Sequence, residues 1–422
     1  MPPQEPVDLC ITVDVEFSIG GAFTFPDLYS PIAQPFVECM VGNRDHGLGF
    51  LLETMERFGL KGTFFVEVLN TACFGDEPMR SYVERIAAAG HDIGLHLHPC
   101  WLAFEQPDWK QILMSKRPVD SLCDRDLSEV EDIMRRGIAI LERWGVRPSV
   151  LRTGGMHVDL GVYRGQSLVD LPLASNVGLG IWQPKERSLQ LMGGHQKIGD
   201  VVEVPVTSYL DKFPLRWNQP RCLTTSATSF REMVHLVRQA RKKKVTPLVL
   251  LTHPFEFVGR SGFRMENLAP NYATQRRFER LCEFVHDNPD LIRAVRFSDR
   301  AEAWHDVEED LTGVTFETTM ALAVTRTFAN NIREAFWKLR GAFVQRKNRM
   351  IRNATTFLFH LFAIAQYGLF PPTDTELAAR PPAMIVAPSG VERLHSILVP
   401  GKGTVLSPNA AKDAVEIGLF EG

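Results

Sequence analysis

The chain has 422 residues, enough for an α/β barrel with an appendage. Its 45% hydrophobic and 23% charged residues are ordinary for a soluble globular protein. The chain carries 47 Lys and Arg against 50 Asp and Glu, a net charge of −3. This balance argues against a general nucleic-acid binder, so no nucleic-acid partner is expected.

Seven cysteines are scattered along the chain, and no two have Cys-x-x-Cys spacing. An odd, dispersed set is typical of reduced thiols in a reducing compartment. The start, MPPQEPVDLCITVDVEF, has no basic region followed by an apolar run, so no secretory signal is predicted. We therefore expect a cytoplasmic protein.

Short apolar runs alternate with amphipathic stretches between residues 7 and 299. The runs predicted as strands cover 7–16, 62–68, 91–98, 149–155, 201–207, 247–254 and 292–299. Apolar residues often stand side by side in them, as buried parallel strands require. Helical periodicity predicts helices over 127–145, 230–244 and 274–289. The alternation predicts a parallel barrel or a doubly wound sheet.

The sequence changes character after about residue 310, so we expect a barrel over 1–310 and a mainly helical C-terminal extension over 311–422. Residues 326–352 carry eight Lys and Arg against one acid and lead into the apolar stretch 354–370, too short and too polar for a membrane span. Two interpretations of 326–370 stay open. It packs on the barrel as a helix pair, or it lies on an anionic membrane face and places the protein peripherally at the inner membrane.

Ionisable residues stand where the predicted strands end, the edge at which α/β folds carry their chemistry. They are Asp14 and Glu16 on the first strand, His96 and His98 on the third, Arg152 on the next, and His253 on a late one. Residues two apart on a strand share a face. The six side chains are therefore expected to converge on one pocket.

Two histidines and a carboxylate make an N,N,O set, which suits Zn²⁺ or a similar divalent ion with an open water position. A metal-bound water, a carboxylate base and a histidine acid opposite it form the layout of a hydrolase. Each residue alone is more often structural, because a histidine at a strand end is usually a hydrogen-bonded core residue. The joint placement is what favours a site.

Six segments in this order also carry a family resemblance: ITVDVEF, LKGTFFVEV, AAAGHDIGLHLHPCW, VLRTGGMH, VVEVPVTSYLD and LVLLTHPFEF. They resemble the motifs of the polysaccharide deacetylase, or NodB-homology, superfamily (carbohydrate esterase family 4), in the DVE form of one branch. The resemblance covers residues 7 to about 305. It implies a distorted (β/α)7 barrel and metal-dependent removal of an acetyl group from a sugar.

The resemblance also implies roles for single residues. Asp14 would be the general base that takes a proton from the metal-bound water, and Arg152 would orient and charge-pair with Asp14. His253 would be the general acid that protonates the leaving group. His96 would be a metal ligand, and Leu251 would contribute to the pocket for the acetyl methyl group.

The sequence departs from the family pattern at two metal positions. Val15 stands where the family has a second Asp, and Glu16 is the substitute we expect as carboxylate ligand. Cys100 stands where the family has its second metal histidine. Three alternatives stay open there: Cys100 binds the metal as a thiolate, His98 replaces the missing histidine, or the metal site is degraded.

The expected substrate is an acetylated sugar. Trp101, His157 and Trp217 are expected to contact it, with Asp211 as a further candidate. A cytoplasmic location would restrict it to a nucleotide sugar or a lipid-linked glycan of surface-polysaccharide synthesis. Two other functions stay open: a metal-independent C–N hydrolase of the allantoinase-like type, which Cys100 favours, and a catalytically silent barrel that binds glycan or acts as a scaffold.

Overall fold

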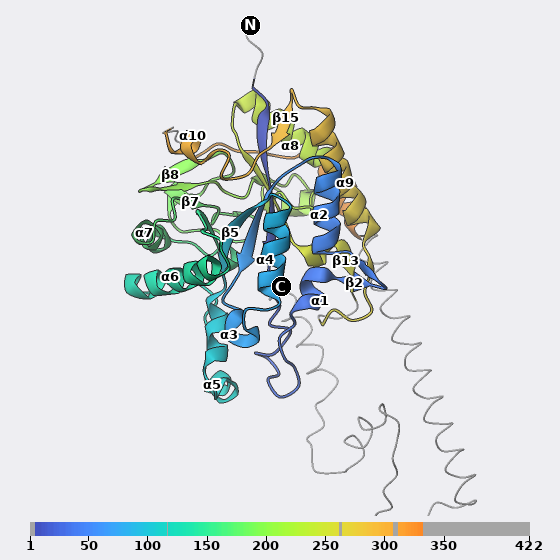
Figure 1. Cartoon of the computed structure of the whole chain (residues 1–422). Coiled ribbons are helices and arrows are strands. Elements are labelled where there is room, and N and C mark those ends of the chain that lie inside the picture. The colour runs from blue at the N-terminus through green and yellow to red at the C-terminus, as the bar shows by residue number, and fades with distance from the viewer. Residues whose placement is uncertain (1–4, 116, 261–263, 307–310, 332–422) are drawn as a thin grey trace, which may run out of the picture. The chain divides into compact units, whose positions relative to one another are not determined.

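The computed structural model describes residues 5–115, 117–260, 264–306 and 311–331. Helices surround a curved, mostly parallel sheet in this part of the chain (Figure 1). Its strands lie in the order β12-β1-β4-β5-β6-β7-β9-β8, and β15 pairs with β1 as well. Their bounds are β1 Val7–Val15, β4 Thr63–Glu67, β5 Asp92–Leu97, β6 Val150–Thr153, β7 Leu173–Ala174, β8 Gln196–Ile198, β9 Val201–Glu203, β12 Leu248–Thr252 and β15 Ile292–Ala294.

Strand β1 lies between β12 and β4 and is buried along its whole length. Its side chains alternate between two apolar clusters. Ile11 and Val13 belong to the larger cluster, which includes the helix side chains, whereas Cys10 belongs to a second cluster with Val249 and Phe65. The period of two therefore places the even-numbered residues of β1 on the inner face of the curved sheet.

Irregular chain closes the gap between β9 and β12. The Val204 amide donates to the Ala174 carbonyl (2.8 Å) and the Thr207 amide donates to the Val249 carbonyl (3.1 Å). The Leu251 amide donates to a carbonyl of the returning segment (3.0 Å). The sheet thus curls on itself through single hydrogen bonds, which confirms the predicted distorted (β/α) barrel.

The helices cover the outside of the sheet (Figure 1). Their bounds are α1 Gln34–Glu38, α2 Leu48–Arg57, α3 Thr71–Phe74, α4 Met79–Ala88, α5 Trp109–Ser115, α6 Leu127–Arg143, α7 Leu160–Leu168, α8 Phe230–Lys243, α9 Tyr272–Asp287 and α10 Ala301–His305. The three helices predicted from periodicity are α6, α8 and α9, which confirms them within two residues at each end. Helix α6 ends before Gly145, whose φ of 82° is the left-handed conformation that favours glycine.

Three small two-stranded antiparallel sheets lie apart from the barrel sheet. They pair β2 (Met40–Val41) with β3 (Arg44–Asp45), β10 (Ser208–Leu210) with β11 (Pro220–Cys222), and β13 (Val258–Gly259) with β14 (Ala269–Pro270). Short 3₁₀ turns follow three barrel strands directly: Pro99–Glu105 after β5, Gly154–Met156 after β6 and Pro254–Phe257 after β12. These turns begin where the polar residues of the predicted site stand.

The predicted boundary at residue 310 stays a prediction, and the first compact unit of the chain runs past it to Lys338. Phe316 is fully buried, and Arg326 is 3% exposed with ion pairs to Asp211 and Glu232. Residues 311–331 therefore pack with the barrel. Most of the predicted membrane element, 332–370, and the tail to 422 lie outside the described residues. Within the described ranges no helix is both long and apolar enough to cross a membrane.

Candidate active site

The structure brings the six predicted residues together at the carboxyl ends of β1, β5, β6 and β12. Arg152 Nη1 lies 2.6 Å from Asp14 Oδ1. The other carboxylate oxygen of Asp14 lies 3.8 Å from His253 Nε2 and 4.0 Å from His96 Nε2. Asp14 is thus the centre of the group, with its charge partner on one side and two imidazoles on the other.

Arg152 is fully buried, so its charge needs partners in the protein. Besides Asp14, it donates to Thr12 Oγ1 (3.0 Å), to Ser175 Oγ (2.8 Å) and to the Ser175 carbonyl (3.2 Å). Its guanidinium lies 3.9 Å from the centre of the Phe65 ring. These contacts fix the guanidinium in one place, and through it the orientation of the Asp14 carboxylate. Thr12 and Ser175 were not predicted from the sequence.

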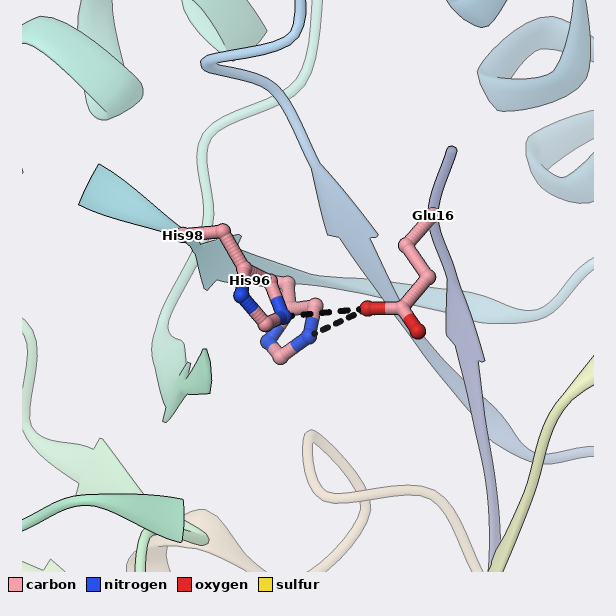
Figure 2. A group of neighbouring side chains, drawn as sticks. All are labelled: Glu16, His96 and His98. Atoms are coloured by element: carbon pink, nitrogen blue, oxygen red, sulfur yellow. Dashed lines mark hydrogen bonds and ion pairs between the residues drawn. The ribbon is translucent and has the colours of Figure 1, made fainter. Parts of the chain in front are cut away.

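Glu16 faces both predicted histidine ligands (Figure 2). Its Oε2 atom lies 3.3 Å from His96 Nε2 and 3.0 Å from His98 Nε2. Burial alone would raise the pKa of Glu16, but the hydrogen bonds from the two imidazoles hold it well below the usual range.

The second nitrogen of each imidazole decides what the first one can do. His96 Nδ1 lies 2.9 Å from the Arg152 carbonyl, and His98 Nδ1 lies 2.6 Å from Asp120 Oδ2. Carbonyl and carboxylate oxygens only accept, so both Nδ1 atoms carry the hydrogen. Burial alone would lower the pKa of His98, but the charges and hydrogen bonds of Asp120 and Glu16 raise it well above the usual range, so His98 Nε2 can carry a hydrogen that it donates to Glu16. In the neutral tautomers that metal binding requires, both Nε2 lone pairs point at Glu16 Oε2 instead.

Three lone pairs that face one another repel unless a proton or a cation lies between them. The three ligand atoms of Glu16, His96 and His98 all lie within 4.8 Å of one another. Two imidazole nitrogens and one carboxylate oxygen are a donor set that Zn²⁺ accepts, with a fourth position left for water. The residues present therefore fit a divalent metal ion.

Asp120 binds the Nδ1 atom of His98 and so orients the ring, and it was not predicted from the sequence. The amide of Cys100 donates to Asp120 Oδ1 (3.3 Å). Burial alone would raise the pKa of Asp120, but the charge of His98 and hydrogen bonds from His98 and Cys100 lower it. Asp120 lies on the loop between α5 and α6, away from every motif, so the sequence carried no local signal for it.

Cys100 lies on the Asp120 side of His98. Its sulfur belongs to a group with His98 and Asp120 whose ligand atoms lie within 4.8 Å of one another, whereas Glu16 and His96 face the other nitrogen of the same ring. Of the three alternatives, this geometry favours His98 as the replacement ligand. Gly154 makes room for that ring, because a Cβ there would lie 2.5 Å from His98 Nδ1.

His253 follows β12 and is held by a carboxylate that the sequence analysis missed. Its Nδ1 lies 3.2 Å from Glu256 Oε1, and Glu256 Oε2 accepts a hydrogen bond from Thr252 Oγ1 (2.9 Å). Burial alone would lower the pKa of His253, but the Glu256 hydrogen bond and the charges of Glu16, Glu256 and Asp14 raise it to about 9. Glu256 stands three residues after His253, a spacing that would have supported its inclusion.

Two of the expected substrate contacts lie by the site. Leu251 is 2% exposed and belongs to the inner apolar cluster, two residues before His253. His157 Nδ1 lies 3.2 Å from the carbonyl of Asp120. The His157 ring also contacts Trp182 at 4.5 Å between ring centres, and Trp182 is 38% exposed. An aromatic rim therefore adjoins the Asp120 loop.

Of the other expected contacts, Trp101 and Asp211 are buried, whereas Trp217 is exposed and stays a prediction. Trp101 is 1% exposed and packs in the main core against Phe74 and Phe104, at 5.9 and 5.5 Å between ring centres. Its side chain fills the space behind β5 and does not face a substrate. Trp217 is 53% exposed and lies on a separate loop, where Lys212 Nζ lies 5.2 Å from the centre of its ring. Asp211 is fully buried and forms an ion pair with Arg326, so its carboxylate is not exposed to a substrate.

Comparisons with models of protein families and with curated proteins find no match. Among solved structures, the chain is similar to a polysaccharide deacetylase so described from Mycobacterium smegmatis (20% identity, 75% of this chain, 97% of that chain, TM-score 0.42). It is also similar to a family 4 carbohydrate esterase from Streptomyces lividans, with 11% identity over 68% of this chain and 91% of that chain and a TM-score of 0.34. A pseudoenzyme of the same family from Bacillus anthracis has 9% identity over 75% of this chain and 71% of that chain, with a TM-score of 0.36. The likeness is distant, so the chemistry proposed below depends on the side chains of this chain.

Proposed function

We propose that the protein is a metal-dependent hydrolase that removes an acetyl group from a sugar. The observation that carries this proposal is the convergence of the Glu16, His96 and His98 lone pairs beside Asp14, Arg152 and His253. A divalent ion held by the first three would supply Lewis acidity to a water and to the acyl oxygen. The resemblance of the sequence motifs points to the same reaction.

Asp14 is the base in this proposal. Its Oδ1 is bound by Arg152, which leaves Oδ2 facing the two imidazoles, 3.8 Å from His253 and 4.0 Å from His96. That oxygen takes the proton from the attacking water. The buried guanidinium keeps the carboxylate in place and supplies the positive charge that a carboxylate buried to this degree requires.

His253 is the acid. Its raised pKa, about 9, keeps the imidazolium form populated at neutral pH. Nε2 faces the carboxylates of Asp14 and Glu16, whereas Nδ1 is held by Glu256. The Nε2 proton passes to the nitrogen or oxygen of the sugar as its bond to the acetyl carbon breaks, so the products are acetate and the free amine or hydroxyl.

The substrate we propose is a nucleotide sugar or a lipid-linked glycan in the cytoplasm. The exposed Trp182 ring beside His157 supports a sugar, because the apolar face of a sugar ring stacks on aromatic side chains. Leu251 would meet the acetyl methyl group at the bottom of the site.

Metal analysis and acetate release from a panel of acetylated nucleotide sugars and lipid-linked glycans test this proposal together. We expect about one equivalent of Zn²⁺, acetate release that a chelator abolishes, and a loss of about 10²–10⁴-fold in kcat for Asp14→Asn. Asp27→Asn is the matched control, because that side chain is 91% exposed. Hydrolysis of cyclic amides that a chelator does not affect would favour the allantoinase-like alternative. Asp14→Asn with full biological activity would favour the scaffold.

A further inference from the structure

A second hollow, separate from the candidate active site, is lined by arginines. It has a volume of about 180 Å³. Arg216, Arg221 and Arg326 line it, together with Ala227, Asn330 and Asn331. Guanidinium groups are the side chains that recognise phosphate best, because each offers a planar pair of N–H donors.

The charges in this hollow do not balance. Arg326 is 3% exposed and takes both nearby carboxylates, with Asp211 at 2.6 Å and Glu232 at 2.8 Å. Arg221 lies 3.9 Å from the same Asp211 oxygen that Arg326 already binds. Among the described residues, the ion pairs of these three arginines involve two carboxylates, so the excess positive charge falls on Arg216 and Arg221.

Arg221 adds a second sign of a missing partner. Its Nε atom is buried and makes no hydrogen bond within the described part of the chain. A buried N–H without an acceptor costs about 1–3 kcal/mol. The carboxylate of Asp211 is too far away to accept this hydrogen at 3.9 Å, so Asp211 pairs with Arg221 only loosely and the charge of the guanidinium is left for another partner.

Backbone carbonyls on one wall are already occupied. Arg277 Nη1 donates to the carbonyls of Thr225 and Ser226, both at 2.8 Å. Asn330 Nδ2 donates to the carbonyl of Ala227 at 3.4 Å. Carbonyl oxygens bound in this way do not repel an anion as unpaired ones would.

The wall of the hollow begins at the edge of the barrel where the candidate active site lies. Thr225 donates its amide hydrogen to the carbonyl of Leu251 at 3.4 Å, and Thr224 forms a parallel bridge with Leu251. Leu251 precedes His253 by two residues. Residues 224–227 therefore leave the barrel at its carboxyl edge and lead directly into the arginine-lined hollow.

We propose that this hollow binds a phosphate or diphosphate group, with Arg216 and Arg221 as its main contacts. The proposal rests on the charges and donors of the hollow and does not require the hydrolase activity. The phosphate could belong to a free metabolite or to a lipid headgroup, and binding experiments distinguish these two sources.

The test uses the full chain and inorganic pyrophosphate as the probe, measured by isothermal titration calorimetry. Arg216→Gln and Arg221→Gln should each weaken pyrophosphate binding about tenfold to a hundredfold, the loss of one charge-assisted contact. Arg216 is exposed, so its variant should fold normally even if Arg221→Gln does not. Arg44→Gln, at an exposed arginine paired with Glu53, should change nothing. No pyrophosphate binding, or equal loss in the control, overturns the proposal.

Co-sedimentation with vesicles identifies the source of the phosphate. Vesicles that contain phosphatidylglycerol are compared with vesicles of phosphatidylcholine alone. If Arg216→Gln and Arg221→Gln weaken sedimentation with the anionic vesicles, the group is a lipid headgroup. If only pyrophosphate binding falls, the ligand is a soluble phosphorylated compound. Both results support the hollow as a phosphate site.

Discussion

The buried ion pair between Arg152 and Asp14 allows a quantitative test of the site geometry. The perturbation is a pair of substitutions, Arg152→Met and Asp14→Asn, made singly and together. Methionine keeps an unbranched side chain over the Phe65 ring, where the guanidinium now lies at 3.9 Å. Asparagine keeps the shape of Asp14 and removes its charge.

The expected magnitudes follow from burial. The Arg152 side chain is 0% exposed and that of Asp14 is 4% exposed, so neither charged group is hydrated by bulk solvent. Removal of one partner from a buried pair costs about 3–5 kcal/mol, because it leaves the other charge uncompensated. The double variant leaves neither charge of this pair uncompensated, so its cost should be smaller than the sum of the single costs by about 2–3 kcal/mol.

Urea unfolding, followed by tryptophan fluorescence and circular dichroism, measures the free energy of unfolding of all four proteins at pH 7. A control pair of exposed partners, Arg80 and Glu84, should show a coupling below about 0.5 kcal/mol. Additive costs for Arg152→Met and Asp14→Asn would refute the reasoning, since additivity means that the two charges do not depend on each other.

Three further predictions concern the histidines. Activity should fall as the pH rises through about 9, the pKa of His253, and Glu256→Gln should move this fall to lower pH by about one unit in a pH–rate profile. Asp120→Asn should weaken Zn²⁺ affinity, measured with a competing chelator, by about 10–100-fold because His98 loses its orienting carboxylate. Gly154→Ala should also weaken Zn²⁺ binding by displacing the His98 ring, and unchanged affinity would contradict the proposed ligand.

Most of the barrel could be predicted because its strands are apolar on both faces. β1, β4, β5, β6 and β12 lie within the predicted runs. β7 was missed because only Leu173 and Ala174 form it, too few residues for a periodic pattern. Residues 204–207 were predicted as strand within the run 201–207, but the strand β9 ends at Glu203 and the chain after it is irregular.

The wrong expectation for Trp101 has a physical cause. It follows Cys100 within the histidine segment, and the sequence alone suggested that the whole segment lines the site. In the structure, the 3₁₀ turn Pro99–Glu105 carries the indole behind β5, against Phe74 and Phe104. Sequence proximity to a ligand did not fix the direction of the side chain.

The sequence by itself determined which ionisable residues share a strand face and a strand end, because side chains alternate with a period of two. That was enough to place Asp14, His96 and His253 at one edge. Only the tertiary structure decided that Asp120 and Glu256 support the two histidines from behind. These carboxylates stand on loop and turn segments, whose paths depend on packing across the whole rim and leave no periodic trace in the chain.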